Sequence, residues 1–249
     1  MGAGKQYWID VGGAEGGGAR RIAVEIKNAA RSRSFKIRLL DADRALLTKP
    51  KYSSIKEALE FLESSRDWLA GHAASARPAI PLAQYLRENP EIYGESEKLE
   101  ISFIASRTSP FYVEDAASGK LVFAARADFF DADCASLFMK YAARKIPLLV
   151  RVEAERTGLG YAKVSVRDQS GRWGSRSSGG TLSFNWRIML LPPPLRKYII
   201  CHELAHSRFM DHSVSFWIFL NRICPDAQKL DAQVGELSKK IFNIILTKG

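Results

Sequence analysis

The chain has 249 residues, of which 46% are hydrophobic, and it carries a formal net charge of +10 at pH 7. No apolar run approaches the roughly 18 residues of a membrane-spanning helix, and the N-terminus lacks the apolar stretch of a secretory signal peptide. The three cysteines are scattered and odd in number, which argues against a disulfide framework. We therefore expect a globular, reduced, cytoplasmic protein with no membrane partner.

The positive charge is concentrated at the start of the chain. Residues 1–56 contain twelve Lys or Arg and five acidic residues, a net charge of +7. A field of this sign attracts polyanions, so the region predicts a nucleic-acid partner. A solvated basic face that keeps the protein soluble is the alternative interpretation.

The first residues of the chain predict a flexible segment, then strands and one helix. Residues 1–19 are rich in glycine and are expected to form a flexible leader. Ser54 and Glu57 have the spacing of a capping box, so a helix should start there and end near Gly71. Short β-like runs precede this helix, at 22–26, 35–40 and 45–47.

The middle of the chain continues the β pattern and then turns helical. Residues 78–127 alternate turn signals with β-like stretches, so we expect 20–128 to form a basic, β-rich N-terminal subdomain with one helix. Residues 129–249 are expected to form a second domain. Its first part predicts a helix over 131–145 and another helix that begins at Pro147.

The last third of the chain predicts two strands followed by helices. Residues 161–169 and 181–190 alternate apolar and polar side chains, as half-buried strands do. Three consecutive prolines at 192–194 favour the start of a helix directly after them. The tail from 226 to about 246 is typical of an amphipathic closing helix.

The stretch "CHELAH" contains the HExxH pattern of a metal site. His202 and His206 are four residues apart, so on a helix both imidazoles project from one face and can bind one Zn²⁺. Glu203 is turned about 100° away from the ligands, which places its carboxylate beside the metal, within reach of a metal-bound water. The pattern predicts a zinc site with Glu203 as the general base.

A catalytic zinc usually has three protein ligands, and His212 is the expected third. It lies six residues beyond His206, so it can return to the metal only if the helix ends between 208 and 211. Glu236 on the closing helix is an alternative ligand, and Asp211 is a further one. The alternative interpretation of Glu236 is a carboxylate on the solvated face of that helix.

The segment from Arg172 to Trp217, "RWGSRSSGGTLSFNWRIMLLPPPLRKYIICHELAHSRFMDHSVSFW", resembles the YgjP-like metallopeptidases, a bacterial zincin family related to the SprT and WLM domains. The resemblance is strong over roughly 130–230 and looser upstream. Where this chain has Arg176, the family commonly has Cys. The resemblance implies an α+β fold: a minimal zincin-like metallopeptidase domain, with helices packed on a short mixed sheet, and a smaller β-rich N-terminal subdomain.

The same resemblance implies the roles of individual residues. His202, His206 and His212 match the zinc ligands, and Glu203 matches the general base. In zincins the edge strand of the sheet pairs with an extended substrate. The strand around 181–187 is the candidate for that edge, and an ordinary core strand is the alternative.

We therefore expect a zinc metallopeptidase that hydrolyses peptide bonds in a peptide or protein substrate. Arg172, Asn185 and Tyr198 are candidates to stabilise the oxyanion or contact the substrate, because they lie near the motif in sequence. No other cofactor is expected. Two other functions stay open: a DNA-associated protease acting on protein–DNA adducts through the basic N-terminal region, and a non-catalytic zinc-containing module that binds peptides.

Overall fold

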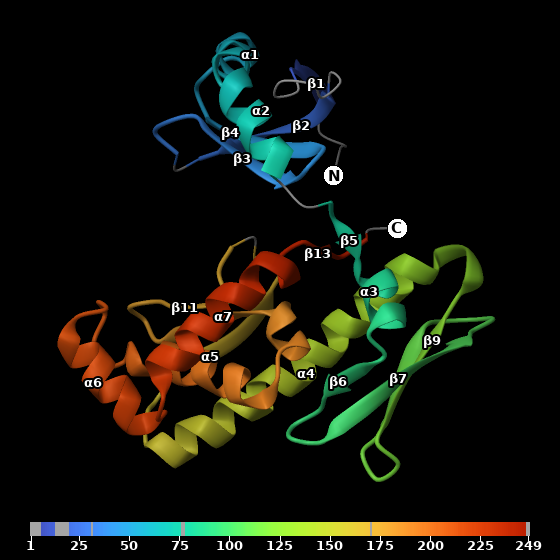
Figure 1. Cartoon of the computed structure of the whole chain (residues 1–249), viewed down its shortest axis with the longest axis vertical. Coiled ribbons are helices and arrows are strands. Elements are labelled where there is room, and N and C mark those ends of the chain that lie inside the picture. The colour runs from blue at the N-terminus through green and yellow to red at the C-terminus, as the bar shows by residue number, and fades with distance from the viewer. Residues whose placement is uncertain (1–5, 13–19, 31, 76–77, 170, 248–249) are drawn as a thin grey trace. The chain divides into compact units, whose positions relative to one another are not determined.

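The computed structural model describes residues 6–12, 20–30, 32–75, 78–169 and 171–247. The chain divides into two compact units, Met1–Ala79 and Ile80–Gly249 (Figure 1). Each unit buries its own cluster of apolar side chains, so each has the hydrophobic core of a folding domain. None of the described helices is long and apolar enough to span a membrane.

The first unit is a four-stranded sheet covered by two helices. Its strands lie in the order β1-β2-β4-β3, with β2 and β4 parallel and the two outer pairs antiparallel. Ile22, Val24 and Leu47 of the sheet are fully buried, and Leu62 and Leu69 of the helices pack with them. The elements are β1 (Gln6–Val11), β2 (Arg20–Ala29), β3 (Lys36–Asp41), β4 (Arg44–Pro50), α1 (Ile55–Ser64) and α2 (Arg66–Ser75).

Strand β1 falls within the predicted flexible leader, so the structure differs from the prediction there. Its residues pair with β2 along their whole length, and Ile9 and Val11 are buried in the core. Backbone pairing and this burial outweigh the flexibility of the neighbouring glycines. The rest of the predicted leader, at 1–5 and 13–19, lies outside the described residues.

The helical part of the first unit starts as predicted but is divided. The Ser54 hydroxyl accepts a hydrogen bond from the Glu57 N–H at 3.1 Å, and the Glu57 carboxylate accepts one from the Ser54 N–H at 2.6 Å. The predicted capping box is therefore confirmed. One helix was expected up to Gly71, whereas the backbone leaves the helical geometry at Ser65, with φ −95° and ψ 5°, and then continues as α2. The Ser65 hydroxyl donates to the Phe61 carbonyl at the end of α1.

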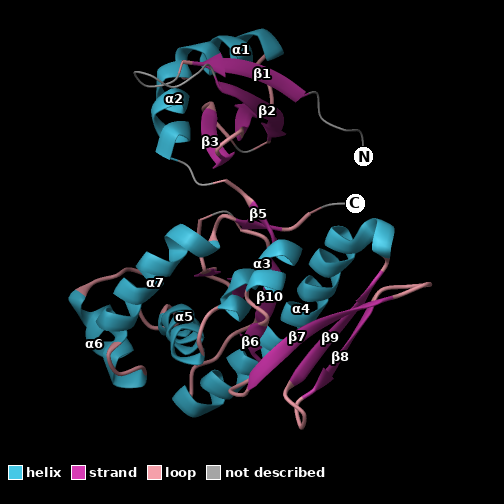
Figure 2. Cartoon of the chain, turned by 45° about the vertical axis from the view of Figure 1, so that its right-hand side comes forward, coloured by secondary structure: helices cyan, strands magenta, loops and turns pink. Residues whose placement is uncertain are grey.

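In the described residues, the second unit contains two small mixed sheets, a two-stranded pairing and five α-helices (Figure 2). It also has two short 3-10 helices, Ala127–Phe129 and Trp186–Leu190. The strand orders are β6-β7-β9-β8 and β10-β12-β11, and β5 pairs with β13. Helices packed on short mixed sheets are the fold that was predicted, and this expectation is confirmed. The elements are β5 (Ile80–Pro81), α3 (Leu82–Glu88), β6 (Glu91–Tyr93), β7 (Lys98–Ala105), β8 (Phe111–Asp115), β9 (Lys120–Ala125), α4 (Phe130–Thr157), β10 (Lys163–Arg167), β11 (Gly174–Arg176), β12 (Thr181–Asn185), α5 (Pro193–Ala205), α6 (Val214–Ile223), α7 (Ala227–Ile241) and β13 (Ile244–Ile245).

The boundary between the units differs from the one predicted at 128/129. Residues 80–128 belong to the second unit, because the apolar face of their sheet packs against α4. Phe123 of β9 lies 6.3 Å from the Phe138 ring of α4, centroid to centroid, and both side chains are fully buried. Sequence alternation identified these strands but not the helix that covers them.

Helix α4 is one continuous helix of 28 residues, in place of the two predicted. Pro147 lies inside it, although proline removes a backbone donor and usually kinks or ends a helix. Ile146 and Val150 on either side of the proline are fully buried in the same core, and this packing holds the two parts together. The helix ends at Thr157, and its C-cap Gly158 has a φ of 69°, in the left-handed region that glycine adopts readily.

Strand β12 lies in the centre of its sheet, so the prediction that residues 181–187 form an edge is wrong. It pairs in parallel with β10 on one side and antiparallel with β11 on the other. Leu182 and Phe184 are fully buried, which agrees with its alternative interpretation as a core strand. The edge strands of this sheet are β10 and β11.

Candidate metal centre

Helix α5 and the turn after it bring the three motif histidines together. The helix begins at Pro193, whose fixed φ suits a first turn, and ends at Ala205 with His206 as its C-cap. The chain then reverses until Ser213, whose side chain caps α6. The helix thus ends before His212, as a return of that side chain toward α5 requires.

The imidazoles of His202, His206 and His212 converge. One ring nitrogen of each lies within 4.8 Å of those of the other two, and the Nε2 atoms of His202 and His212 are 3.0 Å apart. Three nitrogens bound to one zinc at about 2.0–2.1 Å in tetrahedral geometry would stand about 3.3 Å apart. The fully buried Phe216 ring lies 4.9–5.1 Å from each imidazole, centroid to centroid, and so supports all three. The donor set and its spacing fit a zinc ion.

Hydrogen bonds on the far side of two imidazoles direct their Nε2 atoms to the common point. The Tyr198 hydroxyl donates to Asp231 Oδ1 at 2.7 Å, so its oxygen can accept from His202 Nδ1, which is 3.2 Å away. His206 Nδ1 donates to the Phe209 carbonyl at 2.8 Å. With the proton on Nδ1, each Nε2 has a free lone pair, which is the usual arrangement of a metal-binding histidine.

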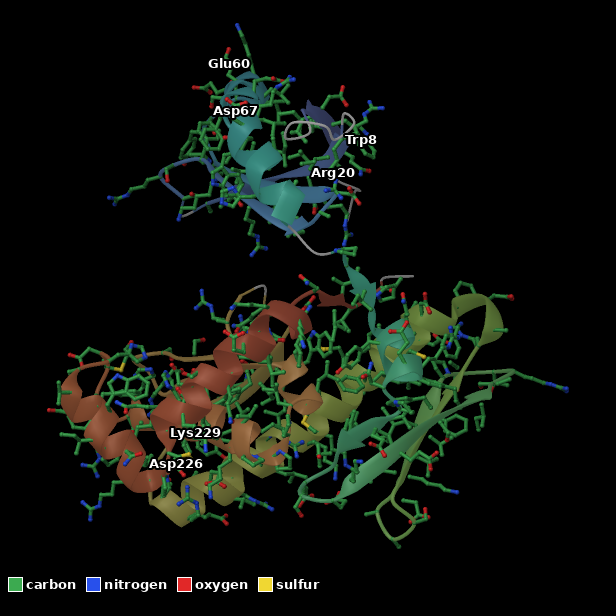
Figure 3. All side chains as sticks on the ribbon, viewed as in Figure 1. Trp8, Arg20, Glu60, Asp67, Asp226 and Lys229 are labelled. Carbon is green, nitrogen blue, oxygen red and sulfur yellow. The ribbon has the colours of Figure 1, made fainter. Side chains whose placement is uncertain are left out.

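Asp231 reaches this network from α7, which lies along α5 (Figure 1). Asp226, labelled in Figure 3, starts the helix with a left-handed φ of 62°, and Val234 anchors it in the core. The Trp173 indole N–H donates to the Ser238 hydroxyl at 2.8 Å and links α7 to the segment before β11. Asp231 was not predicted, because a carboxylate 29 residues beyond His202 on another helix has no local signal in the sequence.

Burial favours the neutral, metal-binding form of two of the three histidines, His202 and His206. Burial lowers the pKa of His202 to about 3, and the neighbouring imidazoles act in the same direction. Burial also lowers the pKa of His206. Both nitrogen lone pairs are therefore available at neutral pH, without the proton release that a charged imidazole would need.

Glu203 is buried between α5 and β11. The residue is 6% exposed, and burial raises the pKa of its carboxyl to about 7, while Arg172 and Arg176 act in the opposite direction. Gly174 makes room for it: a Cβ at that position would stand 2.7 Å from both Cγ and Oε1 of Glu203. A carboxylate with a pKa near neutrality can both take up and release a proton.

The three residues predicted to stabilise the oxyanion or contact the substrate have different positions and partners in the structure. Tyr198 lines a pocket of about 220 Å³ together with His202 and Glu203, although its hydroxyl is engaged with Asp231. Arg172 is exposed and lies close enough to lower the pKa of Glu203.

Asn185 has a different role from the one predicted. Its side chain is fully buried, and its amide donates to the carbonyls of Gln169 at 2.6 Å and Arg172 at 3.1 Å. Its oxygen accepts from the Arg187 N–H at 3.1 Å. Asn185 therefore fastens the loop before β11 to the end of β12, and none of its polar atoms is left to contact a substrate.

The two alternative third ligands lie elsewhere. The Glu236 side chain is 75% exposed and pairs with Lys239 at 3.0 Å. Asp211 accepts a hydrogen bond from the Ser213 N–H at 3.3 Å. Among the described residues, neither belongs to the cluster of converging ligand atoms.

Comparison with known proteins places this site in context. The family model described as "YgjP-like, metallopeptidase domain" matches residues 33–236. No curated protein matches the chain. A solved structure that it resembles is the metallopeptidase zymogen abylysin of Pyrococcus abyssi, with 23% sequence identity over 40% of this chain and 99% of that chain, at a TM-score of 0.34.

Proposed function

The chain belongs to the YgjP-like metallopeptidase family, and on that premise we propose that it hydrolyses peptide bonds with a zinc ion held by His202, His206 and His212. Glu203 is the general base of this proposal. The observation that carries it is the convergence of three imidazole nitrogens beside one buried carboxylate. Three nitrogen donors favour zinc over the harder divalent ions, which prefer oxygen ligands.

In this proposal each residue of the site has a separate role in hydrolysis. A bound zinc ion would supply Lewis acidity, which makes water nucleophilic near neutral pH and polarises a carbonyl. Glu203 accepts a proton from the attacking water at its carboxylate and delivers it to the leaving amine. Tyr198 and Asp231 hold His202 in one tautomer, and Phe216 keeps the three rings in place.

Strand β11 is the edge that we propose for the substrate, in place of β12. It is an outer strand of its sheet, and its Gly174 lies directly against Glu203. An extended peptide that paired with β11 would add a strand through main-chain hydrogen bonds and would lie next to the base.

Two other functions have weaker support. A non-catalytic peptide-binding module has no use for a buried carboxylate beside its metal, so Glu203 argues against that alternative. A protease that acts on protein–DNA adducts rests only on the charge of the N-terminal region, and the comparisons give no support to a nucleic-acid partner.

The test is the Glu203→Gln variant with zinc loaded. We expect it to bind zinc in the same molar ratio as the wild type and to lose casein and peptide hydrolysis by at least about a thousandfold, since the base is removed and the ligands are kept. Glu236→Gln, on the exposed face of α7, is the matched control and should stay active. A fully active Glu203→Gln protein would exclude Glu203 as the base, and wild-type activity that survives complete zinc removal would exclude the metal.

A further inference from the structure

The pocket beside the histidines is lined by both apolar and acidic side chains. Trp173, Ile199 and Val234 are apolar residues of its lining, and Asp231 contributes a carboxylate. His202 and Glu203 line the same pocket, so it lies next to the position of the bond to be cleaved. Its volume of about 220 Å³ suits a single side chain.

Asp231 is an exposed residue of α7 and has no ion-pair partner among the described residues. None of the described lysines, arginines or histidines forms an ion pair with it, and no lysine or arginine lines the pocket. Glu203, the other carboxylate there, has Arg172 and Arg176 close enough to act on its pKa. Asp231 accepts one hydrogen bond, from Tyr198, and a carboxylate has room for about three more.

We propose that this pocket binds a lysine or arginine side chain of the substrate, next to the scissile bond. The aliphatic stem would pack on Trp173, Ile199 and Val234, and the charged end would bind Asp231. Long basic side chains combine these two properties, an apolar stem and a cationic tip. This inference deepens the proposed function and rests on it for the statement that the ligand is a peptide.

The free α-amino group of a peptide offers the same cationic chemistry. A carboxylate near a metal site could bind an N-terminal ammonium, and the enzyme would then remove terminal residues. The pocket has three apolar side chains in its lining, which a short terminal ammonium would leave largely uncovered, so a long side chain is the better fit. Peptides with free and with acetylated N-termini distinguish the two sources.

The experiment compares peptides that differ at one residue. Norleucine has the stem of lysine without its ammonium group, so the ratio of kcat/KM for the lysine peptide to that for the norleucine peptide reports the contact with the charge. For acetylated peptides we expect a ratio of about ten or more in the wild type, the usual effect of a charged hydrogen bond. In Asp231→Asn the ratio should fall to about one. Because the ratio compares two substrates of one variant, a loss of His202 orientation cancels out.

Controls separate this inference from the proposed function. Glu236→Gln removes a carboxylate from the same helix outside the pocket and should keep the wild-type ratio. Zinc-loaded Glu203→Gln should bind the lysine peptide about tenfold more tightly than the norleucine peptide by calorimetry. If Glu203→Gln shows this binding preference but the wild type hydrolyses neither peptide, the peptidase proposal fails and the pocket assignment stands.

Three results would overturn the assignment. The first is equal cleavage and equal binding of the lysine and norleucine peptides by the wild type. The second is an unchanged ratio in Asp231→Asn. The third is a preference that follows the free N-terminus and disappears on acetylation, which would assign the pocket to an α-ammonium group.

Discussion

Gly174→Ala tests whether the position of Glu203 limits the activity. The backbone of Gly174 does not have the left-handed conformation that only glycine adopts easily, so alanine is compatible with it. The added methyl group is the whole perturbation. It would stand 2.7 Å from Cγ and Oε1 of Glu203 and 2.9 Å from Cδ.

The size of the effect follows from these distances. Carbon atoms in contact prefer about 3.5–4.0 Å, so the Glu203 side chain or strand β11 must move by about 0.8 Å or more. A displacement of about 1 Å in an aligned site can cost on the order of a hundredfold in rate. We therefore expect kcat to fall by about ten- to a hundredfold, while the three histidines keep their zinc.

The assay combines peptide kinetics with zinc content and the melting temperature. Gly179→Ala, in the turn between β11 and β12, is the control, because the nearest atom to its added Cβ would be 3.9 Å away. Wild-type kcat in Gly174→Ala would show that Glu203 need not occupy its observed position. A parallel loss of zinc would show that the whole site, and not the base alone, had been disturbed.

Three further perturbations test the metal network and the second unit. Tyr198→Phe removes the hydroxyl between His202 and Asp231, and zinc affinity, measured by competition with a chelator, should fall about ten- to a hundredfold. His212→Ala should lose stoichiometric zinc in metal analysis, and a variant that kept it at wild-type affinity would exclude this ligand. The hydrogen bonds from Arg126 lower the pKa of Asp133, so the stability that they contribute is present above the ordinary carboxyl pKa and is lost as the pH falls toward the lowered one. Melting temperatures measured from pH 6 down to about pH 2 should accordingly fall less steeply for Asp133→Asn than for the wild type, and equal slopes would contradict this reasoning.

Local spacing alone determined several features of this protein. Four residues separate His202 from His206, and a helix of 3.6 residues per turn necessarily brings both to one face. The capping box at Ser54 and the proline start of α5 are also contacts within one turn of chain. Such features depend only on residues that are close in sequence, so the sequence alone is enough to predict them.

Tertiary structure decided which distant segments meet. The alternation of β12 indicates a strand with a buried face, but only pairing with β10 and β11 on either side makes it a central strand. Asn185 is near the motif in sequence, yet its hydrogen bonds turn it toward the loop before β11. Asp231 reaches the site only because α7 packs along α5. Periodicity specifies which face of an element is buried, whereas the element that covers this face depends on the packing of the whole unit. For this reason the metal-binding histidines could be predicted from the sequence, and the pocket beside them could not.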